Sequence, residues 1–556
     1  MPPRLTRRAL MQGMAAGALL PWWTGLGSAR AAAAEQLFGH GVASGDPDAD
    51  SVVLWTRVRP APGRAQVDWE LAEDPAFARV LRRGTRRTDA SRDFTVKVLA
   101  EGLAPGGTYY YRFVCAGVAS MVGRTRTLPT GSVDSLTLAV ASCSNYPFGY
   151  FNGYDAIARD DGVDLLLHLG DYLYEYGPDG YGGATGARIG RVHAPAQEIV
   201  SLDDYRMRHA QYKADAGSLL MHAAHPLIAI WDDHESANNP WMGGAENHQG
   251  DAEGPWALRR AASLQAYYEW MPVRDAPSAE ARADYWRHFR VGDLASIISL
   301  ETRHTGRAEQ IDYRAHLGER STEDEVEAFR RDVLGAAERR MIPARQEAFI
   351  RDALRECAAA GRPWRVIANQ IPMGRVQVPA LRGPAFDVVA EDPDHPAHAQ
   401  WQGMAALGDF DLPIYLDTWD GYPWARQRFY ELLAGEGVHD ALVLTGDSHA
   451  FWLNRLRDDA GRAMGVELGT TGITSPGDFA DFGDDLGARI DALLAEHNPE
   501  VVWTDNVPRG WLRVTLERDQ ARAEYMAVSN VESTEYIQRV LKTTMLRRDG
   551  GELQIL

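Results

Sequence analysis

The chain has 556 residues, of which 45% are hydrophobic and 24% are charged, and this composition excludes an intrinsically disordered protein. The formal net charge of −19 makes general nucleic-acid binding unfavourable, because that binding needs Lys and Arg to neutralise phosphates. A phosphorylated substrate is still compatible with this charge, since a bound cation can reverse the local field. The three cysteines, Cys115, Cys143 and Cys357, are too few for a disulfide framework.

The first 34 residues are typical of an export signal. Arg7 and Arg8 stand in a twin-arginine-like motif, and a weakly apolar stretch leads to small residues at 28–34 that offer several A-x-A cleavage sites. The alternative is an ordinary secretory signal that holds two adjacent arginines. We expect the twin-arginine export machinery to deliver a periplasmic or secreted protein. No later segment reaches about 18 uninterrupted apolar residues, so we expect no transmembrane anchor.

Residues 36–130 form the first predicted domain, and their pattern is typical of an all-β fold. The segments 52–58, 67–71 and 108–114 are rich in β-branched and aromatic residues. A Pro-Gly-Gly turn at 105–107 precedes the last of them. Short strands at this spacing predict a β-sandwich that is immunoglobulin-like in outline.

Residues 135–556 form the second predicted domain, in which continuous apolar runs alternate with helical patterns. Runs that are apolar on both faces indicate sheets covered on both sides, so the alternation predicts an α/β fold. The predicted strands are 136–142, 164–169, 226–231, 364–368 and 441–445. The predicted helices are 202–213, 256–270, 323–360 and 425–435.

Polar clusters follow these apolar strands at the point where each strand ends. In open α/β sheets, ligands bind at the carboxyl ends of the strands, so we expect the clusters to converge on one site. Their side chains include carboxylates, imidazoles, an amide, a thiol and a phenol, which are all metal-binding groups, and the mixture favours two unlike ions. The clusters are 142–145, 170–175, 232–235, 369–370 and 446–449.

Several of these motifs resemble one known family. GDYLYE at 170–175, WDDHE at 231–235 and GDSH at 446–449 follow the motif order of the calcineurin-like metallophosphoesterases. Their particular variants, with Cys143 in place of a D-x-H motif, resemble the PhoD-like branch of alkaline phosphatases. GVASGDP at 41–47, LWTRV at 54–58 and GTTGITSPG at 469–477 extend the resemblance along nearly the whole chain. It implies a metallophosphoesterase-type β-sandwich flanked by helices.

The resemblance also implies a set of metal ligands. Asp171 would bridge two ions, because its two oxygens can each hold one. Thiolate and phenolate donors favour a trivalent iron on one side, and an all-oxygen set favours calcium over zinc on the other. The iron side would be Cys143, Tyr174 and His449, and the calcium side Asp233, Asn369 and Asp447.

Two further residues take catalytic roles in this interpretation. His234 would contact the phosphate or act as general acid to the leaving alkoxide. Arg303 would stabilise negative charge in the transition state. The neighbouring Glu301 departs from the family pattern, in which an aspartate is expected, and this makes Arg303 the weaker match.

Each candidate also has a structural interpretation. Cys143 could be an inert buried residue, Tyr174 a packing aromatic and Asn369 a turn residue. Within WDDHE, one aspartate could cap a helix, and we assign the cap to Asp232 and the metal to Asp233.

The predicted function is therefore hydrolysis of phosphomonoesters, phosphodiesters or both by a metal-activated hydroxide. The alternative within the enzyme class is a phospholipase D or a phosphodiesterase of an envelope polymer. The substrate would be a phosphorylated small molecule, a lipid or such a polymer. A different class is a surface-binding protein with an inactive catalytic half, which the intact ligand set disfavours.

Overall fold

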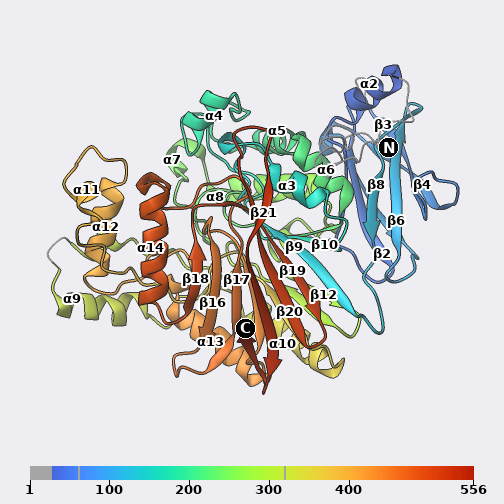
Figure 1. The fold of residues 1–556 in the computed structure, drawn as a ribbon. Helices are drawn as coiled ribbons and strands as arrows, with labels where there is room; N and C mark the ends of the chain where they lie inside the picture. The colour runs from blue at the N-terminus through green and yellow to red at the C-terminus, as the bar shows by residue number, and fades with distance from the viewer. Residues whose placement is uncertain (1–27, 60–62, 319–320) are drawn as a thin grey trace, which may run out of the picture.

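The computed structural model describes residues 28–59, 63–318 and 321–556, and its largest element is a mixed ten-stranded sheet (Figure 1). Four neighbouring strands in its middle, β9, β10, β11 and β1, run parallel, and the remaining pairs are antiparallel. The strand order is β22 (Glu552–Ile555), β21 (Gln538–Asp549), β20 (Gln520–Val528), β19 (Arg509–Glu517), β9 (Ser135–Ala141), β10 (Leu165–His168), β11 (Leu227–Ala229), β1 (Val42–Gly45), β2 (Ser51–Arg57) and β5 (Thr95–Glu101).

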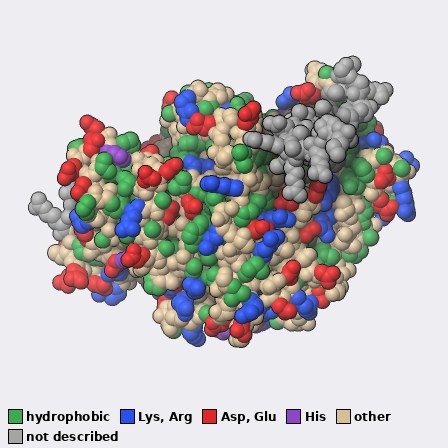
Figure 2. Space-filling model, viewed as in Figure 1, with side chains coloured by type: hydrophobic (Ala, Val, Ile, Leu, Met, Phe, Trp, Pro, Cys, Tyr) green, Lys and Arg blue, Asp and Glu red, His purple; other side chains and the backbone are tan. Residues whose placement is uncertain are grey.

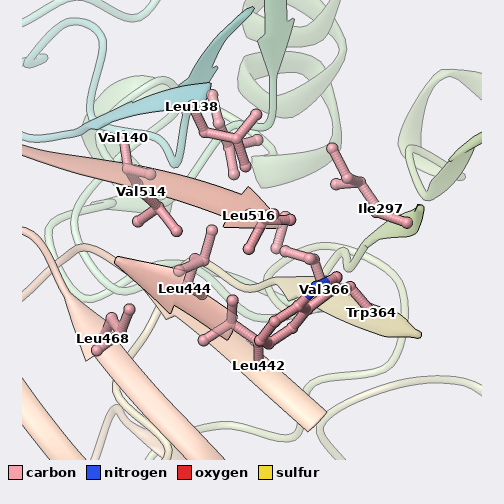
Figure 3. Close-up of a cluster of buried hydrophobic side chains, with 14 of the residues drawn as sticks. Leu138, Val140, Ile297, Trp364, Val366, Leu442, Leu444, Leu468, Val514 and Leu516 are labelled. Atoms are coloured by element: carbon pink, nitrogen blue, oxygen red, sulfur yellow. The ribbon is translucent and has the colours of Figure 1, made fainter. Parts of the chain in front are cut away.

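A seven-stranded sheet packs against the first sheet. Its order is β12 (Arg287–Val291), β13 (Ala295–Ser299), β14 (Trp364–Ala368), β15 (Ala441–Thr445), β17 (Ala463–Gly469), β16 (Phe451–Arg457) and β18 (Val501–Asp505). One buried apolar cluster joins Leu138 and Val514 of the ten-stranded sheet to Val366, Leu442 and Leu444 of the seven-stranded sheet (Figure 3). The continuous apolar runs are explained by this arrangement, because each central strand buries both of its faces.

Helices cover the outer face of each sheet. On the ten-stranded sheet they are α3 (Asn152–Ala158), α5 (Leu202–Lys213), α6 (Ala216–Ala224) and α8 (Trp256–Trp270). On the seven-stranded sheet they are α10 (Ala344–Ala359) and α13 (Pro423–Gly435). A peripheral cluster joins α11 (Asp387–Ala390), α12 (His398–Gly408) and α14 (Asp484–His497). The expected mixed α/β architecture is confirmed, and three predicted helices, 202–213, 256–270 and 425–435, occur within two residues of their predicted bounds.

The predicted helix at 323–360 is wrong. The chain forms α9 (Glu323–Ala328), continues as a π-helical segment over Phe329–Leu334, and then leaves the helix at Gly335. The next helix, α10, begins only after Pro343. Glycine weakens a helix interior, and proline lacks the N–H that an interior position needs, so the apolar spacing across this break does not produce one helix.

The N-terminal part consists of two β layers, and one of them continues into the ten-stranded sheet. A five-stranded sheet contains β4 (Val80–Thr88), β3 (Ala65–Ala72), β6 (Thr108–Cys115) and β7 (Val118–Ala119), with β8 (Gly123–Arg126) beside β6. The second layer is β1, β2 and β5, and β1 pairs with β11 at Gly45 and Leu227. Arg287 binds Asp46 directly after this pair, which adds a charged contact across the junction.

The predicted signal at 1–34 lies almost entirely outside the described residues, which begin with α2 (Ser28–Leu37). None of the described helices has both the length and the apolar character needed to cross a bilayer.

Four buried histidines lie between the ten-stranded sheet and its helices. The backbone N–H of Gly170 donates to Nδ1 of His168, while Nε2 of that ring contacts the Tyr154 hydroxyl at 2.6 Å. A second proton on this ring would therefore face an N–H group. Burial lowers the pKa of His40 and of His168 to about 3, and it lowers those of His209 and His222 well below the usual value.

These histidines predict that the fold loses stability in acid. Each is neutral in the folded protein but protonates below about pH 6.5 when unfolded, so its contribution is complete above pH 6.5 and is lost as pH falls towards 3. For a folded pKa of about 3, the loss at pH 5 is about 2 kcal/mol per histidine. Urea unfolding at pH 8 and pH 5 measures this difference. His168→Gln should reduce it, whereas the exposed control His316→Gln should not.

Candidate metal centre

The predicted site lies where the strand ends of both sheets meet. Cys143, Asp171 and Asp233 follow β9, β10 and β11, which are adjacent parallel strands. Asn369 and Asp447 follow β14 and β15, which are also adjacent and parallel. A bridge between Ser142 and Gly472 and the bond from the Gly446 N–H to the Gln370 carbonyl hold these loops together.

Three groups of donor atoms form one continuous cluster. In each group the atoms lie within 4.8 Å of one another. Asp171 belongs to the first and second groups, and Asp233 to the second and third, so the three groups are linked. The groups are Cys143, Asp171 and His449; Asp171, Asp233 and His234; and Asp232, Asp233 and Asp447.

Tyr174 joins the first of these groups. Its hydroxyl donates to Oδ2 of Asp171 at 2.9 Å and lies 3.1 Å from Nε2 of His449. Ser475 donates to the same hydroxyl at 2.8 Å. The phenol oxygen is therefore within reach of the same point as the thiol, the carboxylate and the imidazole.

The backbone at four predicted ligands is left-handed. The φ angles of Cys143, Asp171, Asp447 and His449 are 59°, 54°, 67° and 52°. Residues other than glycine rarely adopt this backbone conformation, and such strain concentrates at functional sites. Before Asp171, Gly170 has a φ of 106°, and a Cβ there would meet Asp232 at 2.4 Å. The turn therefore needs glycine, and it directs Asp171 into the cluster.

The cluster buries more negative than positive charge. Four aspartates meet there, and burial raises the pKa of Asp171 and of Asp447 well above the usual value. The neighbouring cations are Arg303, which donates to Asp232 at 2.5 Å and to Asp447 at 2.9 Å, and the imidazole of His234. Among the described residues, one oxygen each of Asp171, Asp232 and Asp233 is buried without a hydrogen-bond partner.

These observations fit bound metal ions. Buried charges need compensation, and unpartnered carboxylate oxygens that point into a shared space are suited to cations. The Cys143 sulfur lies in the same group of donor atoms as Asp171 and His449. Burial and the nearby Asp171 raise the pKa of its thiol, so a thiolate there would need a cation close to the sulfur.

His234 is held by a second carboxylate. Its Nδ1 lies 2.7 Å from Oε2 of Glu175, and its ring stacks on Tyr174 with 4.2 Å between the centroids. Burial disfavours the charged ring, but Asp233, Glu175 and Asp171 outweigh it and raise the pKa of His234 well above its usual value. A protonated His234 can donate a hydrogen bond or a proton from Nε2.

Not every predicted ligand makes the expected contact. Asn369 ends β14 as expected, but its amide nitrogen donates to the Ile371 carbonyl at 2.6 Å, and its oxygen lies 3.5 Å from the Trp419 indole nitrogen. The helix-cap interpretation of Asp232 is wrong, because no helix begins in the described segment 231–240. Its carboxylate belongs to the cluster through Arg303 instead.

Two glutamates hold the backbone of the site in place, and their sequence context alone does not predict this role. Glu235 accepts the N–H groups of Asp171, Tyr172 and Asp232 at 3.1, 2.6 and 2.8 Å, which ties two strand-end loops together. Glu301 accepts the N–H groups of Arg303 and His304 and so fixes the turn that carries the guanidinium. Tyr181, which stacks on His449, had no recognisable sequence signal.

Most of the chain matches known proteins. Residues 138–525 match the PhoD-like phosphatase family, and residues 25–129 match the N-terminal domain of PhoD-like phosphatases. The chain belongs to the PhoD-like phosphatase family. It is 37% identical over 505 residues to alkaline phosphatase D of Bacillus subtilis (strain 168), covering 88% of this chain and 77% of that protein.

A solved structure of PhoD supports the same assignment. It superposes with a TM-score of 0.76 at 33% identity, covering 94% of this chain and 92% of that one. The resemblance to PhoD-like phosphatases inferred from the motifs is thereby confirmed.

The contact between Glu175 and His234 predicts a large effect of Glu175→Gln. The substitution removes the charge that favours protonated His234, so we expect kcat to fall at least about tenfold with a smaller change in KM, because a proton-transfer group contributes 10²–10⁴-fold. Glu198→Gln is a matched control, since Glu198 also accepts from Asn247 but makes no described contact with His234. Equal losses in both variants would contradict a positioning role for Glu175.

Proposed function

We propose that this chain is an exported, metal-dependent phosphoesterase that hydrolyses phosphomonoesters, phosphodiesters or both. The observation that carries the proposal is the linked cluster of thiol, phenol, imidazole and carboxylate donors, with buried oxygens that have no described protein partner. The family and the relative named alkaline phosphatase D favour the same chemistry.

We propose that the cluster holds two unlike ions. Cys143, Tyr174 and His449 would hold a trivalent iron, and Asp171 would face both ions. Asp233 and Asp447 would hold calcium with the help of Asp232, and Asn369 would join them if its amide turned from Ile371. Zinc is the alternative metal. When bound, such ions neutralise phosphoryl oxygens and lower the pKa of a bound water.

The protein's own residues would bind the substrate and move the proton. His234, charged by its carboxylate neighbours, would donate a proton to the leaving alkoxide. Arg303 is fully buried and holds Asp232 and Asp447, so its main role would be to fix these carboxylates. That role replaces the direct transition-state contact expected from the sequence.

A cavity of about 500 Å³ adjoins the centre and could receive the alcohol part of the substrate. Trp241, Tyr313 and Tyr415 line it together with Asn239 and Asp417. The Asn239 N–H donates to Asp233 at 3.0 Å, which places this wall beside the cluster. Room for an alcohol group is compatible with a phosphomonoesterase and with the alternative, a phospholipase D or envelope-polymer phosphodiesterase.

The wider context is part of the same proposal. We infer a metallophosphoesterase-type sandwich at 135–556, an immunoglobulin-like domain at 36–130 and a signal at 1–34 that directs twin-arginine export to the periplasm or outside. The substrate would be a phosphorylated small molecule, lipid or envelope polymer.

Hydrolysis of two nitrophenyl esters tests the proposed function. We expect the metal-loaded protein to release nitrophenol from nitrophenyl phosphate or bis-nitrophenyl phosphate at alkaline pH, and the ratio of kcat/KM values separates monoesterase from diesterase. Failure to hydrolyse either ester with iron, calcium or zinc supplied would favour the surface-binding protein with an inactive catalytic half.

The thiol is tested by Cys143→Ala. We expect loss of activity and of bound iron with little change in the unfolding midpoint, because a metal ligand is removed from a site whose backbone is held by the surrounding sheets. Metal analysis of protein exported by its own pathway gives the iron, calcium and zinc contents. The control is Cys357→Ala, which removes an equally buried thiol from α10 and should keep both metal and activity. Full metal content in Cys143→Ala would refute thiolate ligation.

A further inference from the structure

The charge of the chain is divided unevenly between its two parts. Residues 36–130 contain 13 Lys and Arg against 10 Asp and Glu, whereas residues 131–556 contain 41 against 66. The N-terminal part is therefore net positive and the remainder strongly negative. Such asymmetry is typical of proteins in which one part contacts a polyanion.

Four arginines and no acidic residue lie on a single strand, β4. They are Arg82, Arg83, Arg86 and Arg87, and all four are exposed. β4 is the edge strand of the five-stranded sheet and pairs only with β3 within that sheet. It lies at the outer side of the N-terminal part, and Figure 2 shows basic side chains at the corresponding edge of the molecule.

Three of these arginines have neither a carboxylate partner nor a side-chain hydrogen bond to another strand in the described structure. Within the described residues, Arg83, Arg86 and Arg87 have no carboxylate oxygen within 4.0 Å, whereas the nearby Arg79 and Arg112 pair with Glu73 and Glu70. In the described structure Arg86 bonds only the adjacent Thr85 carbonyl, at 3.2 Å. Arg82 is different, since it binds the carbonyls of Glu101 and Gly102 and so joins the two β layers.

The three unpaired guanidinium groups lie along one edge strand and extend from both of its faces. Arg83 and Arg87 stand opposite Glu70 and Gln66 of β3 and share one face of the sheet, while Arg86 points to the other face. The five residues from Arg83 to Arg87 span about 13 Å along the strand. Charge on both sides of one edge suits a chain that runs along the strand better than a flat lipid surface, which one face would meet.

We propose that the β4 edge binds a linear phosphodiester polymer. Its phosphates would pair with Arg83, Arg86 and Arg87, because guanidinium groups bind phosphate oxygens in a bidentate manner. The site lies on the basic part of the chain and needs no catalytic turnover. The competing explanation is that the arginines only prevent edge-to-edge pairing of sheets, which is a common use of charge on edge strands.

A binding experiment on the full chain separates these explanations. The probe is a fluorescent oligothymidylate with phosphorothioate linkages, which presents a polyanion that resists hydrolysis, and anisotropy gives Kd. We expect Arg83→Gln/Arg86→Gln/Arg87→Gln to weaken binding at least about tenfold, with activity on nitrophenyl phosphate unchanged. If three phosphates are neutralised, wild-type affinity should fall about 20-fold between 50 mM and 200 mM salt.

A matched control has the same loss of three positive charges elsewhere. Arg345→Gln/Arg355→Gln/Arg382→Gln removes three exposed arginines that pair with Asp284, Glu436 and Asp409. Equal weakening in this control would overturn the proposal, because net charge alone would explain it. Salt-insensitive binding would also overturn it. Should the glutamine variant aggregate, the triple Arg→Lys variant must retain salt-sensitive binding.

Two further outcomes reject the proposal in favour of a named alternative. Binding of phosphatidylglycerol vesicles without binding of the oligonucleotide would assign the edge to a membrane surface. Unchanged oligonucleotide binding combined with self-association of the glutamine variant would assign the arginines to edge protection.

Discussion

The burial of several carboxylates at one point is the constraint on which this structure depends. Asp171, Asp232, Asp233 and Asp447 come from three strand ends of two sheets, and bringing them together without compensation is unfavourable. Arg303 and His234 offset part of the repulsion. The carboxylate repulsion that these two groups do not offset makes the site suited to metal cations. A bound cation would also account for the imidazole and thiol groups that lie among the carboxylates.

The two-sheet core supplies the rigidity that such a cluster needs. Strained left-handed backbones at Cys143, Asp171, Asp447 and His449 persist only where their surroundings determine them, and here each adjoins a strand packed on both faces. Glu235 adds a local constraint by accepting three N–H groups from two loops. The N-terminal layer contributes as well, since β1 extends the same sheet beyond β11 and makes the two parts mechanically continuous.

The sequence allowed prediction of features that depend on local pattern. Apolar runs followed by polar clusters identified the strands that lead to Cys143, Asp171 and Asp447, because burial on both faces requires continuous apolar sequence. The role of Asp232 could not be found in this way, since it depends on Arg303, which lies 71 residues away. The same holds for the pairing of Glu175 with His234, and for the break at Gly335, where apolar spacing favoured a continuous helix.

The net charges of the two parts would act on a phosphorylated polymer at different distances. A phosphorylated polymer approaching residues 131–556 meets an excess of acidic groups, so long-range attraction there is unfavourable. Within the centre, cations held by the buried carboxylates would reverse the field over a few ångströms, which is too short a range to guide a chain from solution. The unpaired arginines of β4 lie on the net-positive part and would supply the attraction that the acidic part lacks. Capture and hydrolysis would then require opposite charge on the two parts, joined through the sheet that they share.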